Sequence, residues 1–408
     1  MLHPPQNPSP NQALTVIGFV NAAHFIDHYA MLVFAAAVIV IAPVFGLGYG
    51  ELLPYATPGF IAFGAGSLAT GWLGDRWSRR HMMVVFFFGI GAALIAVGFT
   101  HTPGQLSVAL LAVGLFAAIY HPVGTAMLVA HAGPRLGREI GINGVWGNLG
   151  VASSALLTGL VCQYIGWRWA FILPGIAVAA LGIAFAARVR HEPPKTGAKG
   201  AAPAARVSRE AMRRVVAALF ITIVASSTTF NAVTVALPKI FAERLADLTA
   251  SPALLGLIAA GAYVFGALAQ YTIGNLLDKH PLKTVFLPLA LAVAPLVFFS
   301  AHVDGLPFVV AAIGIIIGIF GQVTVNDAMV GKYTSDEWRA RAYSVRYFLG
   351  FTAAGASVGL VAWLHERGGF SLLLQALGVL GILVIIGAFV FPLEDKPAAA
   401  AEPLKSPV

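Results

Sequence analysis

The sequence predicts an all-α integral membrane protein whose twelve transmembrane helices form two pseudo-symmetric halves of six. Hydrophobic residues make up 58% of the 408 residues and charged residues only 10%, whereas a soluble domain carries roughly 25% charged residues. The mean hydropathy is +0.83. Apolar runs of about 20 residues recur along the chain, which is the length that spans a hydrocarbon core of ~30 Å. These runs do not alternate between polar and apolar residues, so they favour helices over barrel strands.

The apolar runs divide the chain into two halves of similar length. We expect the halves at 14–188 and 214–392, joined by a basic linker at 189–213 that is rich in Pro, Ala and Gly and has no apolar periodicity. Short tails at 1–13 and 393–408 are expected to be cytoplasmic. The first apolar run has no Lys or Arg before it, unlike a cleaved signal peptide, and should remain as the first helix. The expected spans are 14–45, 51–72, 82–100, 105–130, 139–165, 168–188, 214–242, 252–277, 283–301, 305–330, 339–364 and 370–392.

The positions of the basic residues predict the orientation. Cytoplasmic loops carry an excess of Lys and Arg. With both termini inside, only Arg168, Lys239, Arg244 and Arg367 of the 25 basic residues fall in outer loops, and Arg346 lies within a span. The net charge of +8 therefore orients the chain in a membrane, expected to be the bacterial inner membrane, and does not indicate nucleic-acid binding. The single cysteine, Cys162, excludes an intramolecular disulfide and a cysteine-based metal site.

A ten-residue motif occurs twice, in the loops after the second and eighth spans. Gly71–Arg80 reads GWLGDRWSRR and Gly274–Lys283 reads GNLLDKHPLK, at an offset of 203 residues. Because 203 is close to half of the 408 residues, the two halves are expected to be copies of one unit. Matching pairs are Gly71 with Gly274, Leu73 with Leu276, Asp75 with Asp278, Arg76 with Lys279, and Arg80 with Lys283.

The pattern Gly-x-Leu-x-Asp-Arg-x-x-Arg-Arg resembles the signature loop of the major facilitator superfamily. The resemblance implies a monomeric secondary transporter with a central cavity and alternating access driven by a gradient. Asp75 would contact the positive N-terminus of the helix that starts near Trp338, and the arginines would pair with carboxylates or lipid phosphates. The alternative is a short basic loop with no gating role. The expected gating motif comprises Gly71, Gly74, Asp75, Arg76, Arg79, Arg80, Gly274, Asp278 and Lys279.

Ionisable residues inside spans are candidates for function because they are costly to bury there. The first span places Asn21, His24, Asp27 and His28 on one helical face. A carboxylate beside two imidazoles can take up and release a proton near physiological pH. These residues are expected to couple protons or bind substrate. The alternative is a hydrogen-bonded cluster that only holds the first helix in place.

Further candidates lie in the fourth, tenth and eleventh spans. His121 precedes Pro122, which frees a backbone carbonyl, so the histidine either lines a cavity or belongs to a structural kink. The repeat offset places it near Asp327, which either faces the cavity or is solvated at a helix end. Arg346 is expected to bind an anionic substrate, to pair with Asp327 as a gate, or to extend to the membrane interface.

Amide and aromatic candidates complete the expected cavity. Asn231 is offset by 203 from His28 and should face the same space. Trp146 and Asn148 stand in a glycine-rich fifth span, where the glycines are explained by close helix packing but these two side chains are not.

The segment Tyr120–Gly124, followed by glycine-rich residues 141–159, resembles the fosmidomycin-resistance group of exporters. That resemblance implies proton-driven export of a small, often anionic, toxic compound, although many such exporters have an arginine where this chain has Tyr120 and His121. The alternative is a proton-coupled importer of a small organic acid or other solute. No enzyme motif, cofactor loop or metal site is found in the sequence.

Overall fold

The computed structural model describes residues 10–133, 136–189, 209–333 and 336–392. Most of the expected linker at 189–213 and of both tails therefore lies outside the described residues. The N-terminal half consists of α1 (Pro10–Val44), α2 (Tyr49–Leu52), η1 (Leu53–Ala56), α3 (Thr57–Arg76), α4 (Arg79–Gly98), α5 (Pro103–Ala117), η2 (Tyr120–Gly124), α6 (Thr125–His131), α7 (Leu136–Tyr164) and α8 (Trp169–Arg188). The C-terminal half consists of α9 (Arg209–Arg244), α10 (Pro252–Lys279), α11 (Leu282–Ser300), α12 (Gly305–Tyr333) and α13 (Asp336–Val390).

The all-α class is confirmed, whereas the count of twelve spans stays a prediction. Ten helices in the described part of the chain are long and apolar enough to cross a membrane. Helix α3 is not among them. Helix α13 counts once, although its backbone is interrupted at Gly368 and Gly369, and Gly369 has a φ of 64° that favours glycine. The interruption falls between the expected spans 339–364 and 370–392.

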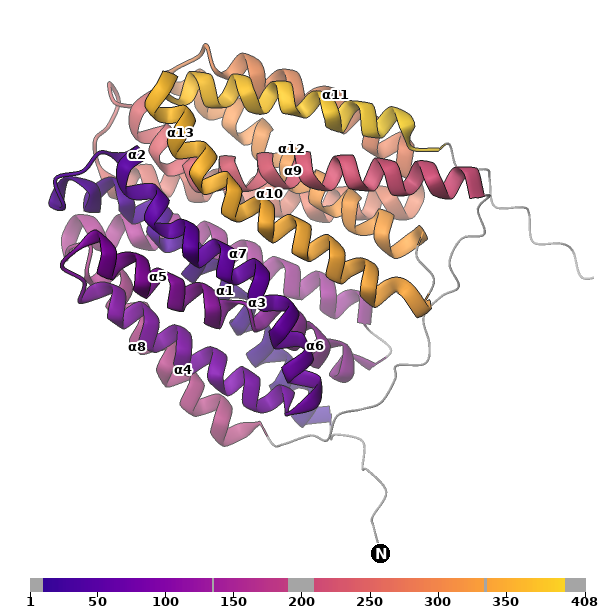
Figure 1. The fold of residues 1–408 in the computed structure, drawn as a ribbon, viewed down its shortest axis with the longest axis horizontal. Helices are drawn as coiled ribbons and strands as arrows, with labels where there is room; N and C mark the ends of the chain where they lie inside the picture. The colour runs from indigo at the N-terminus through magenta and orange to yellow at the C-terminus, as the bar shows by residue number, and fades with distance from the viewer. Residues whose placement is uncertain (1–9, 134–135, 190–208, 334–335, 393–408) are drawn as a thin grey trace, which may run out of the picture.

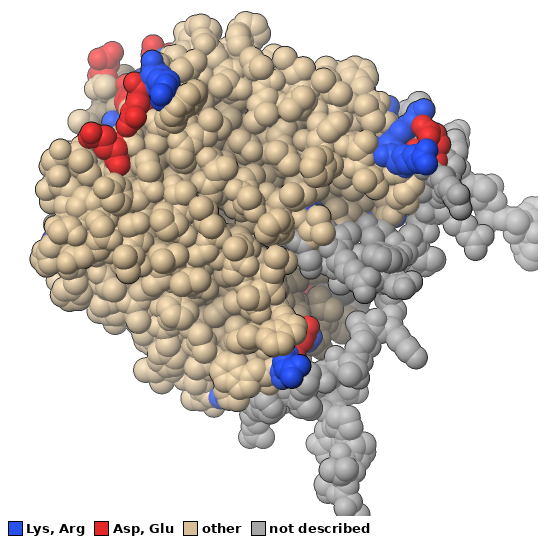
Figure 2. Space-filling model, viewed as in Figure 1, with Lys and Arg blue, Asp and Glu red and all other residues tan. Residues whose placement is uncertain are grey.

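Figure 1 shows the two halves lying side by side, with the indigo-to-magenta helices of the first half against the orange and yellow helices of the second. Across the boundary, α7 packs on α10, α3 on α13, and α1 on α9. Over the face seen in Figure 2, charged side chains gather at the ends of the helices and leave a broad uncharged band between them. Such a band is what a helix bundle presents to lipid.

The repeat has a structural counterpart at the last helix of each half. Arg80 donates from Nε to the carbonyl of Val189 at 2.6 Å and from Nη2 to that of Ala186 at 2.6 Å, at the end of α8. Lys283 donates to the carbonyls of Phe389 and Phe391 at 2.7 and 2.6 Å, at the end of α13. Both cations satisfy carbonyls that a helix leaves unbonded at its C-terminus. Arg80 and Lys283, which are related by the offset of 203 residues, therefore make the same kind of contact with the last helix of their half.

Aromatic contacts join the two halves at the end of the bundle that carries α2. The ring of Tyr49 lies 5.1 Å from that of His365 and 5.9 Å from that of Phe370, centroid to centroid. His365 Nε2 is 3.0 Å from an oxygen of Glu243, which also lies 3.2 Å from the Lys239 ammonium. Burial raises the pKa of the Tyr49 phenol, with a smaller contribution from Glu243, so the phenol remains neutral at physiological pH.

Candidate functional site

Helix α1 presents the predicted polar face toward α7 and η2. His28 Nε2 lies 3.1 Å from His24 Nε2, and the two rings are 4.9 Å apart. His24 Nδ1 lies 2.7 Å from the backbone carbonyl oxygen of Asn143 on α7. A carbonyl can only accept, so Nδ1 of His24 carries the proton in this contact and its Nε2 is left as an acceptor for His28. The contact with α7, which is distant in sequence, therefore fixes the orientation of the His24 ring, and His24 in turn contacts His28.

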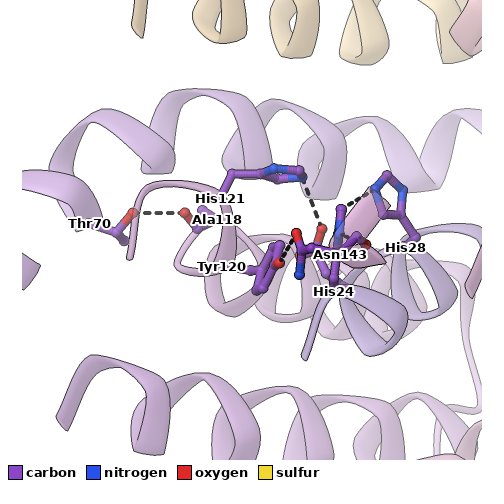
Figure 3. A network of polar contacts seen from close by, with 8 residues as sticks. His24, His28, Thr70, Ala118, Tyr120, His121 and Asn143 are labelled. Carbon is purple, nitrogen blue, oxygen red and sulfur yellow. Dashed lines mark hydrogen bonds and ion pairs between the residues drawn. The ribbon is translucent and has the colours of Figure 1, made fainter. Parts of the chain in front are cut away.

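His121 reaches this face because the helix that carries it is distorted at η2. Pro122 has no N–H, so the carbonyl of Ala118 loses its usual helical donor. The hydroxyl of Thr70 on α3 donates to that carbonyl at 2.8 Å (Figure 3). The chain passes Tyr120–Gly124 as a single π-helical turn, a distortion that is frequent at functional sites. The turn places the His121 side chain against α1.

The carboxylate of Asp27 and the ring of His121 form the centre of the site. Oδ2 of Asp27 lies 3.3 Å from Nε2 of His121, and the two side chains are 1% and 15% exposed. The centroid of the His121 ring is 5.6 Å from that of His24 and 5.7 Å from that of His28. Three imidazoles and one buried carboxylate, from α1 and η2, therefore meet in one cluster. Figure 3 shows the three histidines of this cluster.

A hydrogen-bond network holds the cluster in place. The Tyr120 hydroxyl donates to Oδ1 of Asn143 at 3.0 Å, and Nδ2 of Asn143 donates to Oδ1 of Asn21 at 2.9 Å. The Tyr120 ring also stacks on His24 at 4.7 Å. Asn143 and Thr70 are not among the site residues predicted from the sequence, although Asn143 lies in the Gly/Asn-rich start of the fifth span. Their position next to η2 comes from tertiary packing.

Two phenylalanines place His121 at the boundary between the halves. The ring of Phe63 on α3 lies 5.8 Å from His121, and that of Phe351 on α13 lies 5.1 Å from it. The two phenyl rings are 4.4 Å apart. His121 thus contacts aromatic side chains from both halves, so a movement of one half against the other changes its surroundings.

The second half contributes an ion pair. Nη1 of Arg346 on α13 lies 2.6 Å from Oδ1 of Asp327 on α12, and Nη2 donates to the carbonyl of Val323 at 3.4 Å. The Arg346 side chain is 11% exposed. Of the three expectations for Arg346, the structure contains the pairing with Asp327.

The other predicted cavity residues are placed differently. Asn231 donates to the carbonyl of Ser227 in its own helix at 2.8 Å. Trp146 is 39% exposed. Nδ2 of Asn148 donates to Oε1 of Gln270 at 2.6 Å, which joins α7 to α10 across the halves. Among the described residues, none of these three side chains forms a hydrogen bond, ion pair or ring contact with the histidine cluster.

The motif residues divide into a packing group and a charged group. A Cβ added to Gly74 would lie 2.8 Å from Val123, and one added to Gly71 would lie 3.1 Å from Pro122, so these glycines let α3 approach η2. Asp75, which is 68% exposed, pairs with Arg79 at 2.7 Å. Asp75 was expected to contact the N-terminus of the helix that starts near Trp338. The side chains there lie outside the described residues, so this contact stays a prediction. The guanidinium of Arg76 lies over the Trp72 ring, while Asp278 and Lys279 are exposed at the end of α10.

Comparisons with known proteins agree with this architecture. A puromycin resistance protein of Streptomyces alboniger is 32% identical over 136 residues, which cover 32% of this chain and 27% of that protein. A multidrug resistance protein B homologue of Mycobacterium tuberculosis is 33% identical over 130 residues, covering 30% and 23%. The chain thus spans about a quarter of the length of these relatives.

The solved structure of a D-xylose–proton symporter superposes with a TM-score of 0.71 at 16% identity, over 93% of this chain and 97% of that one. Identity at this level shows the fold alone. The sequence profile of the Major Facilitator Superfamily matches residues 17–246 and 219–407, which together cover almost the whole chain. The protein therefore belongs to the Major Facilitator Superfamily, a family of membrane transporters and not of enzymes.

Proposed function

We propose that this transporter is a proton-coupled exporter of a small drug or metabolite that works by alternating access, with Asp27 and His121 as its proton site. The observation that carries the proposal is the pair itself. A carboxylate that is 1% exposed lies 3.3 Å from an imidazole, with two more imidazoles beside it. A buried ionisable group in a membrane protein marks an ion or proton pathway by default.

The position of the pair supports coupling to conformational change. His121 contacts Phe351 of the other half. With one proton on the pair of Asp27 and His121, the pair has no net charge, and without that proton it carries one negative charge. Gaining or losing one proton thus changes the charge at the boundary between the halves, where rocking motions alter contacts.

The proposal of an anionic substrate depends on Arg346. Its guanidinium is engaged with Asp327 at 2.6 Å, so an anion would have to displace that carboxylate. Arginine suits such an exchange because its planar fork binds carboxylates and phosphates in two-point geometry. An anionic substrate is therefore expected to depend on both Arg346 and Asp327.

Export is favoured over import by the names of the relatives, which are drug resistance proteins, and by the resemblance of 120–159 to fosmidomycin-resistance exporters. We further propose a monomer in the bacterial inner membrane with both termini in the cytoplasm, because the predicted outer loops carry few basic residues. Small solutes and protons would be its only partners besides lipid.

A susceptibility panel tests this function. The wild type, Asp27→Asn and the control Asp247→Asn, whose carboxylate is exposed after α9, are expressed at matched membrane levels in a bacterial host that lacks its own exporters. The wild type and the control are expected to confer resistance to at least one small toxic compound, and Asp27→Asn is not. Resistance in all three would remove Asp27 from coupling, and greater sensitivity with the wild type would indicate uptake.

A further inference from the structure

The three imidazoles of the site lie at distances suited to a shared ligand. One ring nitrogen of each of His24, His28 and His121 lies within 4.8 Å of the other two. The Nε2 atoms of His24 and His28 are 3.1 Å apart. Zinc–nitrogen bonds are about 2.0–2.1 Å long, so two nitrogens of a tetrahedral zinc site are separated by roughly 3.4 Å. The three nitrogens are therefore close enough to one another to act as ligands of one cation.

The ring of His24 already has the hydrogen bond that metal-binding histidines use. Metal-bound imidazoles nearly always donate their other N–H to a carboxylate, a carbonyl or water, which fixes the tautomer and the ring orientation. Nδ1 of His24 does so to the carbonyl of Asn143 at 2.7 Å, and its Nε2 lone pair then points into the cluster. Asn143 is itself held through its side chain by Tyr120 and Asn21.

The cluster also contains negative charge. A divalent cation is costly to place within a membrane bundle unless charge and ligands compensate it. The Asp27 carboxylate, 1% exposed, lies 3.3 Å from His121 Nε2. Asp27 can therefore neutralise part of the charge and offer an oxygen.

We propose that His24, His28 and His121 bind one divalent transition-metal cation of the zinc class, with Asp27 supplying charge and a fourth, oxygen ligand. Imidazole nitrogen favours zinc, copper and nickel over magnesium and calcium, which prefer oxygen ligands. Binding needs imidazoles without a proton on the coordinating nitrogen, so the cation displaces any proton held there.

Direct binding to the purified full-length protein tests this proposal. Protein stripped of metal in detergent is titrated with zinc by calorimetry at pH 7.5 and 5.5. We expect one zinc per chain and weaker binding at pH 5.5. His24→Gln and His28→Gln are each expected to weaken binding about tenfold or more, whereas the control His101→Gln, an exposed histidine between α4 and α5, should bind as the wild type does. Absence of stoichiometric binding, or equal affinity in all variants, would overturn the proposal.

X-ray absorption of the zinc-loaded wild type gives a second readout that needs no variant. Scattering from three imidazoles at about 2.0 Å is expected, and a spectrum with at most one imidazole would refute the site even if the variants fold poorly. Neither measurement uses transport. A protein that fails to bind zinc while its resistance still depends on Asp27 would leave the proposed export function standing.

Discussion

Removing the hydroxyl of Thr70 should destabilise the turn that positions His121. Thr70→Val keeps the shape of the side chain but leaves the Ala118 carbonyl without the donor that lies 2.8 Å away. Pro122 cannot replace that donor. An unsatisfied buried acceptor costs about 1–3 kcal/mol, and hydrogen bonds between membrane helices reach about 1.7 kcal/mol in measured cases. We therefore expect a loss of about 1–2 kcal/mol in the free energy of unfolding.

A double-mutant cycle isolates this interaction. In the Pro122→Ala background, the backbone N–H of residue 122 can bond the Ala118 carbonyl, so adding Thr70→Val should cost little. The control is Thr272→Val on α10, because the Thr272 hydroxyl bonds a carbonyl of its own helix at 2.8 Å. Unfolding of each purified variant in detergent is followed by circular dichroism. If Thr70→Val is as stable as Thr272→Val, or if its cost persists beside Pro122→Ala, the account of η2 is wrong.

Three further perturbations follow from the contacts. Arg80→Ala removes two bonds at the end of α8 and should lower the midpoint of thermal unfolding, whereas Arg214→Ala, which loses an exposed pair, should leave it unchanged. Arg346→Ala removes the ion pair with Asp327, so the midpoint of thermal unfolding should fall and should partly recover in the double variant with Asp327→Ala, which removes the second charge as well. No recovery would show that the pairing of the two charges does not contribute to stability. His365→Ala removes the bond to Glu243 and the ring contact with Tyr49. Backbone amides of residues 49–56 should therefore exchange faster with deuterium. Unchanged exchange would show that these contacts do not stabilise that end of the bundle.

The parts of the architecture that depend on local pattern could be predicted from the sequence. Apolar runs long enough to span a bilayer located most helices within a few residues, and the interruption at Gly368 and Gly369 falls where a break between spans was expected. The polar face of α1 follows from helical spacing alone, so His24, Asp27 and His28 were identified together. The orientation of the chain stays a prediction because it rests only on the distribution of charge.

The parts that depend on tertiary packing could not be predicted. Pro122 indicates a freed carbonyl, but only the structure shows that Thr70 on another helix satisfies it. Nothing in the spacing of α1 and η2 indicates that His121 meets Asp27. The motif glycines were assigned to gating by resemblance, whereas Gly74 lies against Val123 of η2. A gating role for the motif remains a prediction, and its glycines have a packing role that the pattern alone did not suggest.

The two halves share a fold but not a chemistry. Arg80 and Lys283, related by the offset of 203, both bond the end of the last helix in their half. The same offset relates His24, Asp27 and His28 to Ser227, Phe230 and Asn231, none of which titrates near physiological pH. The groups proposed to bind protons and a cation thus lie in the first half, while the paired Arg346 and Asp327 lie in the second. In the proposed alternating access, a rocking motion would change the contacts between the two sets of groups, so the charge state of the first half would bias that motion.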